Sequence, residues 1–190
     1  MTLHFKPRLT PEEYLSIERR AEFKSEFFGG EMFTMSGASE PHHLIVINTV
    51  SEIRQQLKKQ PCKVYAKDMR VKVSPTGLYT YADIVVVCGK AEFDDRHFDT
   101  LLNPTLIIEV LSESTETYDR GRKFEHYRTL ESLVEYVLIT QHRPHIESYR
   151  RQPDQQWLLT ESDGLDSILR LEAIACDLVL AEIYDKVESS

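Results

Sequence analysis

The chain has 190 residues, of which 41% are hydrophobic and 28% charged, and its formal net charge is −8 at pH 7. This composition is typical of a folded globule and excludes wholesale disorder, and the length suits one well-buried domain better than two. The acidic balance argues against a protein that coats nucleic acid through its whole surface, but it leaves room for one local basic face that meets DNA.

The sequence also predicts a cytoplasmic protein with no membrane partner. Its first eight residues hold no apolar secretory core, and no apolar run approaches the roughly 20 residues that a membrane span needs. The three cysteines are far apart and odd in number, which indicates neither a zinc site nor a disulfide framework: Cys62, Cys88 and Cys176. We therefore expect a reducing compartment.

The first part of the chain predicts a helix, a hairpin and a second helix. Thr10-Pro11-Glu12-Glu13 has the pattern of a capping box with proline in the first turn, and helical spacing continues to about residue 21. Paired glycines at 29–30 predict a tight hairpin between 26–28 and 32–33. Ser39-Glu40-Pro41 opens the next helix, which ends before residue 61. Its apolar stripe recurs at helical spacing: Val46, Val50, Ile53 and Leu57.

The middle of the chain predicts strands of two kinds. Residues 62–73 alternate in two registers with a slip near Lys67-Asp68, which predicts one half-exposed strand with a bulge. Residues 82–88 and 105–111 are nearly continuous apolar runs, as expected for strands that are covered on both faces. The polar residues 90–103 separate these two buried strands.

The last part of the chain predicts a helix at 115–130 and then mostly strands. The strands are expected at 135–140 and 145–150, joined by a turn at Pro144, and at 156–160, with a short helix within 178–187. No repeat or long linker divides the chain. We therefore expect one domain over residues 1–190, with its core at about 10–187, of the α/β class with a mixed sheet.

Two acidic residues, Asp83 and Glu109, lie inside the buried strands. A buried unpaired carboxylate costs several kcal/mol, so each must be paired, protonated or bound to a metal. Asp83 is near the start of its strand and Glu109 near the end of its own, so antiparallel pairing would bring them to one edge of the sheet. Lys123, four residues after Asp119 in the following helix, could point back at them.

Two acids and a lysine are the groups that metal-dependent phosphodiester hydrolysis needs. The acids hold the metal, the metal polarises the phosphate and lowers the pKa of a bound water, and the ammonium stabilises developing negative charge. Oxygen ligands without a cysteine–histidine cluster favour Mg²⁺ over zinc, with Mn²⁺ as the alternative.

Six blocks of the sequence, spread over about residues 10–187, resemble the Uma family, whose members are assigned as restriction endonucleases of the PD-(D/E)XK nuclease superfamily. The order and spacing of the blocks carry the resemblance: Ser25 to Glu31, Ser36 to Ser39 with His43, Tyr81 to Val87, Ile108 to Thr115, Tyr118 to Phe124, and Glu135 to Ile139.

This resemblance implies a restriction-endonuclease-like αβββαβ core, preceded by a helix and a hairpin and extended by C-terminal strands. It also implies a cytoplasmic protein that commonly forms a homodimer. Asp83 and Glu109 match the metal-binding acids of the superfamily, and the backbone carbonyl of Val110 is a further candidate ligand. Glu26 and His43 match positions that the family retains, and we take them as secondary catalytic candidates.

The sequence departs from the superfamily motif at two positions. Ala82 stands where the motif has proline, a residue without a chemical role. Leu111 stands where the motif has its catalytic lysine, and Lys123 matches the place to which this family has moved the lysine. If Lys123 cannot reach the site, metal binding would survive while catalysis would not.

Each candidate also has a purely structural explanation. Asp83 could start a strand and accept backbone hydrogen bonds, and Lys123 could make a routine pair with Asp119. Glu26 could only cap a hairpin, and His43 could face solvent. The other histidines that we considered form no ligand pattern: His42, His97, His126, His142 and His145.

Charge is unevenly spread along the chain. Residues 54–72 hold seven basic side chains against one acid, Asp68, which suits either a phosphate-contacting face or an ordinary solvated surface. Residues 160–190 hold eight acids and two bases, so we do not expect DNA to approach there.

Two functions of different classes follow from these observations. The first is a Mg²⁺-dependent endonuclease that acts on DNA, with RNA as an alternative substrate. The second is a catalytically silent, nuclease-like dimer that serves as a binding or assembly module.

Overall fold

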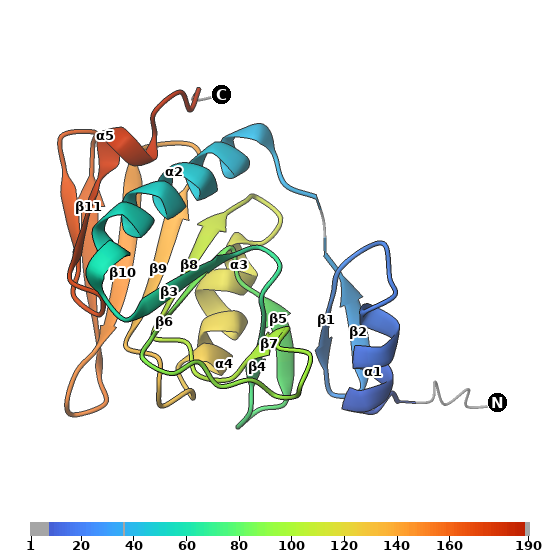
Figure 1. The fold of residues 1–190 in the computed structure, drawn as a ribbon. Helices are drawn as coiled ribbons and strands as arrows, with labels where there is room; N and C mark the ends of the chain where they lie inside the picture. The colour runs from blue at the N-terminus through green and yellow to red at the C-terminus, as the bar shows by residue number, and fades with distance from the viewer. Residues whose placement is uncertain (1–7, 36, 189–190) are drawn as a thin grey trace.

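The computed structural model describes residues 8–35 and 37–188, and at its centre lies a six-stranded mixed sheet (Figure 1). Its strands follow the order β11-β10-β9-β8-β6-β3. β8 and β9 run parallel, and the other neighbours run antiparallel. In chain order the strands are β3 (Cys62–Ala66), β6 (Ile84–Cys88), β8 (Leu106–Leu111), β9 (Glu135–Thr140), β10 (His145–Arg151) and β11 (Trp157–Asp163).

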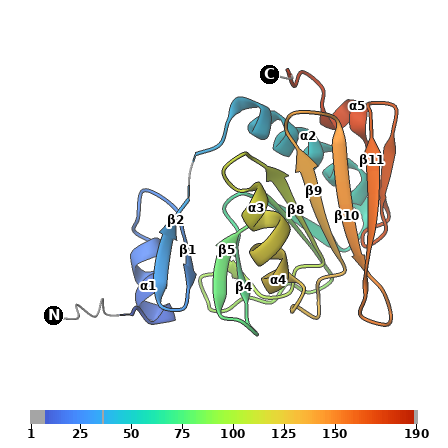
Figure 2. The same cartoon turned by 180° about the vertical axis from the view of Figure 1, so that it is seen from behind.

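Helices cover both faces of this sheet (Figures 1 and 2). On one face lie α2 (Glu40–Gln56), with the 3₁₀ turn Leu57–Lys59, and α5 (Leu180–Ile183). The two-stranded sheet of β12 (Ile168–Leu171) and β13 (Cys176–Val179) packs into the same cluster.

The opposite face carries a helical segment in three parts. These parts are α3 (Glu116–Tyr118), a π-helical turn (Asp119–Lys123) and α4 (Phe124–Tyr127). Side chains of the buried strands alternate between the two faces: Ile108 packs on the α2 side, and Ile107 on the α4 side.

A second, five-stranded sheet has the order β2-β1-β5-β4-β7. In chain order its strands are β1 (Ser25–Phe28), β2 (Glu31–Thr34), β4 (Arg70–Val73), β5 (Leu78–Tyr81) and β7 (Thr100–Leu101). The N-terminal helix α1 (Pro11–Glu18) packs on it through Tyr14, whose ring stacks on Phe27 at 4.8 Å and meets Tyr79 edge-on at 5.5 Å.

The expected fold class is confirmed. The order α2, β3, β6, β8, α3–α4, β9 gives the αβββαβ core, with β4, β5 and β7 inserted between its strands. Local signals also hold: Thr10 and Glu13 form the capping box, and Ser39 caps α2. Gly29 and Gly30, at φ 60° and 88°, form the hairpin turn because glycine adopts positive φ without steric cost.

Several expected boundaries are wrong. Residues 62–73 form two strands in different sheets, because the chain leaves the first sheet at Lys67, which has a positive φ of 53°. The helix expected at 115–130 is interrupted by the π-helical turn. Asp83 lies in a bend before β6 rather than within a strand. The hairpin of β12 and β13 was not expected.

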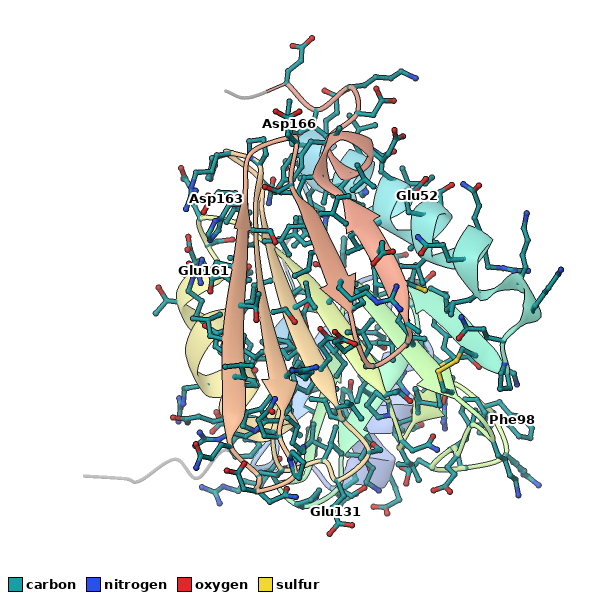
Figure 3. The ribbon with its side chains drawn as sticks, turned by 90° about the vertical axis from the view of Figure 1, so that its left-hand side faces the viewer. Glu52, Phe98, Glu131, Glu161, Asp163 and Asp166 are labelled. Atoms are coloured by element: carbon teal, nitrogen blue, oxygen red, sulfur yellow. A yellow bond between two sulfur atoms is a disulfide. The ribbon has the colours of Figure 1, made fainter. Side chains whose placement is uncertain are left out.

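The expectation of no disulfide is also wrong, since Cys62 and Cys88 are bonded to each other (Figure 3). They are 26 residues apart in sequence but directly opposite in the antiparallel β3–β6 pair, with a Cα–Cα distance of 4.0 Å. The separation of the two cysteines in the sequence could not show that they lie opposite each other on paired strands. The cysteines therefore give no support to a reducing compartment.

Over residues 8–35 and 37–188, no helix combines the length and the apolar character that a membrane crossing requires.

Candidate active site

A cleft of about 1410 Å³ opens where the β1–β2 hairpin, the start of α2, the β5–β6 bend and the end of β8 meet the helical segment α3–α4. Among the side chains that line it, four carboxylates, one ammonium and one imidazole form a connected group: Glu26, Asp83, Glu109, Asp119, Lys123 and His42.

Asp83 and Glu109 lie side by side at the edge of the six-stranded sheet. β6 and β8 pair antiparallel with Ile84 opposite Ile108, so the residue before Ile84 meets the residue after Ile108. The amide of Asp83 donates to Glu109 Oε2 at 3.3 Å, and the amide of Val110 donates to Asp83 Oδ2 at 2.8 Å. The expected convergence of the two acids is therefore present in the structure.

The carboxylate of Asp83 is held in its ionised form. Burial would raise the pKa of Asp83, but hydrogen bonds from His42 and from the Val110 amide outweigh burial and lower it. Both bonds reach Oδ2. Within residues 8–35 and 37–188, no hydrogen bond reaches Oδ1, and this oxygen is available to a ligand in the cleft.

Glu109 is buried more deeply, with 4% of its side chain exposed. Its Oε1 accepts from the Tyr127 hydroxyl at 3.1 Å and lies 2.9 Å from Lys123 Nζ. Burial raises the pKa of Glu109 to about 8, although the nearby Lys123 ammonium acts in the opposite direction. Because burial disfavours the ionised form of Glu109, a positive charge beside it favours that form.

Lys123 reaches the site from the π-helical turn. Its ammonium lies 2.9 Å from Glu109, 3.3 Å from Asp119 and 3.7 Å from Glu26, and it donates to the carbonyl of Tyr81 at 3.3 Å. Burial would lower the pKa of Lys123, but the surrounding carboxylates outweigh it and raise the pKa. Lys123 thus makes the ordinary i,i+4 ion pair with Asp119 and also contacts Glu109.

Glu26 closes the site from the β1–β2 hairpin. Its Oε1 accepts from the Thr80 hydroxyl, and its Oε2 accepts from the Tyr118 hydroxyl at 2.8 Å. Glu26 is therefore more than a hairpin cap, because it joins the second sheet to the helical segment that carries Lys123.

The histidine next to the acids is His42 rather than His43. His43 is exposed, and its Nδ1 lies 2.8 Å from Lys67 Nζ. His42 is buried, and its Nε2 lies 3.0 Å from Asp83 Oδ2. The signal for His42 was the apolar stripe of α2, since His42 lies one helical turn before Val46 on the same face.

The basic segment 54–72 does not form one continuous face. Arg70 is buried and donates to the Tyr81 hydroxyl, and Lys72 pairs with Asp94 at 2.6 Å. Of the seven basic residues, Lys67 is the one that lines the cleft in the part of the chain that the structure describes.

Comparison with known proteins places the chain in a family. The model of the Uma2 family, described as "Putative restriction endonuclease", matches residues 11–181. The chain belongs to this family. Two proteins of Synechocystis sp. (strain ATCC 27184 / PCC 6803 / Kazusa) are similar to it. The protein sll1609 is 37% identical over 156 residues, covering 82% of this chain and 88% of its own. The protein slr1290 is 33% identical over 178 residues, covering 94% and 92%.

A solved structure shares the fold of this Uma2 chain. It is a crystal structure from Anabaena variabilis ATCC 29413, described as "a putative nuclease belonging to DUF820". The TM-score is 0.74 at 18% sequence identity, and the match covers 93% of this chain and 98% of the other. At this identity the likeness shows the fold.

The residues that line the cleft fit a hard divalent cation. Counted as ionised, Glu26, Asp83, Glu109 and Asp119 carry four negative charges against the single ammonium of Lys123 in this connected group, and all of these side chains except Asp83 are buried. Such an excess is unfavourable unless protons or a cation offset it. Carboxylate oxygens are the ligands that Mg²⁺ and Mn²⁺ prefer.

Proposed function

We propose that this Uma2 protein is a Mg²⁺-dependent endonuclease that hydrolyses DNA phosphodiester bonds, with Mn²⁺ as an alternative metal. One observation carries the proposal. The Asp83 amide donates to Glu109, and the other oxygen of Glu109 lies 2.9 Å from the buried ammonium of Lys123. Asp83 and Glu109 would hold the metal, with the Val110 carbonyl as a further candidate ligand. When bound, the metal would polarise the phosphate and lower the pKa of a water.

The protein side chains would supply the rest of the chemistry. A water oxygen forms a bond to phosphorus and one ester P–O bond breaks, so negative charge grows on the phosphate oxygens. The Lys123 ammonium offsets this charge. His42 holds Asp83 by a hydrogen bond, and Glu26, itself held by Tyr118, helps to keep Lys123 in place.

The substrate would enter the cleft past basic side chains at its rim. Lys67 and Arg122 line the cleft and suit contact with phosphates. A homodimer and a cytoplasmic location belong to the same proposal, and both come from the family resemblance.

Cleavage of plasmid DNA and of labelled single-stranded DNA and RNA tests the proposal. With Mg²⁺ or Mn²⁺, we expect the wild type to cut DNA and Asp83→Ala or Glu109→Gln to lose at least about 100-fold in rate, as for other groups that stabilise transition-state charge. The matched control is Glu135→Gln, because Glu135 is an equally buried acid that bonds Ser148 and Ala173. Cleavage by purified Asp83→Ala at the wild-type rate would contradict the proposal.

The second candidate function is a catalytically silent module for binding or assembly. It is favoured by the surroundings of Glu109, both of whose oxygens already have protein partners. Absence of cleavage on all substrates, together with absence of metal binding by the folded wild type, would favour this second function.

A further inference from the structure

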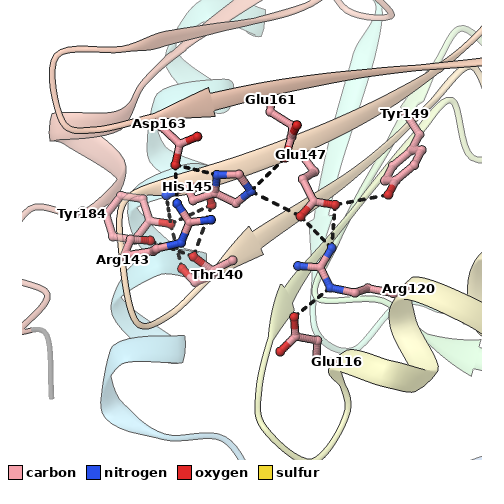
Figure 4. A network of polar contacts seen from close by, with 10 residues as sticks. All are labelled: Glu116, Arg120, Thr140, Arg143, His145, Glu147, Tyr149, Glu161, Asp163 and Tyr184. Carbon is pink, nitrogen blue, oxygen red and sulfur yellow. Dashed lines mark hydrogen bonds and ion pairs between the residues drawn. The ribbon is translucent and has the colours of Figure 1, made fainter.

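A second cluster of ligand-type side chains lies outside the cleft, on β10 and β11 (Figure 4). His145, Glu147 and Glu161 each place one nitrogen or oxygen atom so that the three atoms lie within 4.8 Å of one another. None of the three lines the cleft that holds Asp83 and Glu109.

We propose that His145, Glu147 and Glu161 bind a zinc ion. The first support is distance. His145 Nε2 lies 3.3 Å from Glu147 Oε1 and 3.6 Å from Glu161 Oε1. A charge-assisted hydrogen bond between these groups would be shorter, at about 2.7–2.9 Å. Two ligands on a tetrahedral zinc, each about 2.0–2.1 Å from the metal, lie about 3.3–3.4 Å apart, which agrees with the spacing here.

The second support is the hydrogen bond on the other side of the imidazole. Asp163 Oδ1 lies 2.8 Å from His145 Nδ1, which favours the tautomer with its proton on Nδ1 and its lone pair on Nε2. That lone pair faces the carboxylates of Glu147 and Glu161, and a cation between the three groups would make the contact favourable. Zinc-binding histidines are commonly oriented by such a carboxylate.

The third support is charge. Four carboxylates join the network through Glu116, Glu147, Glu161 and Asp163, and two guanidinium groups join it through Arg120 and Arg143. With a neutral His145, two negative charges are left over, which equals the charge that a divalent cation would neutralise.

The cluster is rigid on one side and open on the other. His145 and Glu147 have 4% and 9% of their side chains exposed, whereas Glu161 is 56% exposed. Arg120 donates to both oxygens of Glu147 at 2.6 and 2.5 Å, and the Tyr149 hydroxyl donates to Oε2 at 3.2 Å. The second lone pair of Oε1, the oxygen that faces His145, is left for a metal. Glu161 can therefore close over an entering ion, and water can fill the fourth position.

A mixed nitrogen and oxygen ligand set also separates this site from the cleft. Imidazole suits zinc and related transition metals, whereas Mg²⁺ prefers oxygen ligands alone. Zinc binding at β10 and β11 is accordingly independent of the proposed nuclease activity.

Equilibrium dialysis of the full chain against Zn²⁺ in excess Mg²⁺ tests the proposal, with Co²⁺ as a spectroscopic substitute. We expect the wild type and Asp83→Ala to bind about one Zn²⁺ per chain and to give visible Co²⁺ bands, as for a site of low coordination number. His145→Gln should abolish both signals. Glu161→Gln, on an exposed position of the edge strand, should weaken zinc affinity about 10-fold or more without affecting folding.

Matched controls are His97→Gln and Glu131→Gln, which remove an exposed histidine and an exposed acid elsewhere. Glu131 is labelled in Figure 3, far from Glu161. Both control variants should bind zinc as the wild type does. Absence of stoichiometric zinc binding would overturn the proposal. Binding that survives in both folded His145→Gln and folded Glu161→Gln would overturn it as well.

Discussion

His42 fixes the position of Asp83 from the buried side of α2. Its Nε2 lies 3.0 Å from Asp83 Oδ2, and its ring is nearly inaccessible to solvent. The Val110 amide donates to the same oxygen, so within the described residues both hydrogen bonds to the Asp83 carboxylate reach Oδ2 and none reaches Oδ1. An outer residue that orients a ligand in this way commonly affects metal affinity as well as activity.

We predict that His42→Ala weakens Mn²⁺ binding by about 10- to 100-fold, the usual effect of losing a partner that orients a metal ligand. His42→Gln should recover part of the loss, since its amide can donate to Asp83. His43→Ala, beside it in sequence but paired with Lys67, should leave Mn²⁺ affinity near the wild-type value. Titration calorimetry measures all three, and the reverse order of His42 and His43 effects would show that the orienting contact is unimportant.

At the residue scale the sequence was informative where a side chain conflicts with its neighbours. Asp83 and Glu109 stood out because an acid in an apolar run needs a partner, and the structure places them in contact. Histidine raises no such conflict, because it is tolerated both in cores and on surfaces. The choice of His43 rested on the family resemblance alone. The pairing of His42 with Asp83 depends on how helix α2 is placed against the sheet, which the sequence does not show.

At the element scale, the π-helical turn is the feature that brings Lys123 to the acids. It spans Asp119–Lys123 between α3 and α4, and both of its end residues are buried in the site. Single π-helical turns often occur at functional sites. The sequence predicted one continuous helix here, because apolar periodicity does not register one additional residue in a turn.

A separate group of ion pairs connects helix α1 to the loop between β6 and β7. Arg19, at the C-terminal end of α1, donates to Asp95 at 2.6 Å and to Asp99 at 2.7 Å. The Arg19 hydrogen bond lowers the pKa of Asp99 to about 2. Burial would raise the pKa of Asp95, but the bond from Arg19 outweighs it and lowers this pKa too.

These lowered pKa values predict a pH-dependent contribution to stability. In the unfolded chain an aspartate titrates near about 3.9, so the network stabilises the fold fully above about pH 5 and loses its effect as the pH falls toward about 2. Arg19→Gln should lower the free energy of unfolding by about 1 kcal/mol or less at neutral pH, because the groups are partly exposed. The difference from the wild type should shrink on acidification.

Urea unfolding across this pH range measures the effect. The control is Arg96→Gln, in the same loop, since Arg96 makes no ion pair with any residue that the structure describes. A deficit of Arg19→Gln that stays constant down to about pH 2 would show that the lost contact does not involve the aspartate charges.

Elements were predictable where the local pattern decides them. The capping box, the glycine turn and the buried runs of β6 and β8 rest on neighbours in sequence. The division of residues 62–73 between two sheets, and the Cys62–Cys88 bond, depend on partners distant in sequence. Local periodicity contains no record of those partners.

On the scale of the whole molecule, the candidate site lies where the two sheets approach each other. The five-stranded sheet contributes Glu26, the six-stranded sheet contributes Glu109, and the bend between β5 and β6 contributes Asp83. The insertion of β4 and β5 between β3 and β6 therefore joins the N-terminal hairpin to the rest of the fold, because β1 pairs with β5. The αβββαβ order and the class were predictable, whereas this closure by the second sheet was not.

Charge is also organised on this scale. The cleft combines an acidic interior with Lys67 and Arg122 at its lining, while Glu161, Asp163 and Asp166 lie on the face formed by β11 and the loop after it (Figure 3). A nucleic acid would be repelled from that acidic face and attracted to the cleft rim. The charges of the cleft and of the β11 face would thus both direct a nucleic acid toward the cleft.

The most direct measurement is a calorimetric titration of Mn²⁺ and Mg²⁺ into the wild type, Asp83→Ala and Lys123→Met, with circular dichroism to confirm folding. We predict that the wild type binds metal, that folded Asp83→Ala does not, and that Lys123→Met still binds it, because both acids remain and a bound cation can replace the ammonium beside them. Equal binding by the wild type and folded Asp83→Ala would contradict a metal site at Asp83 and Glu109.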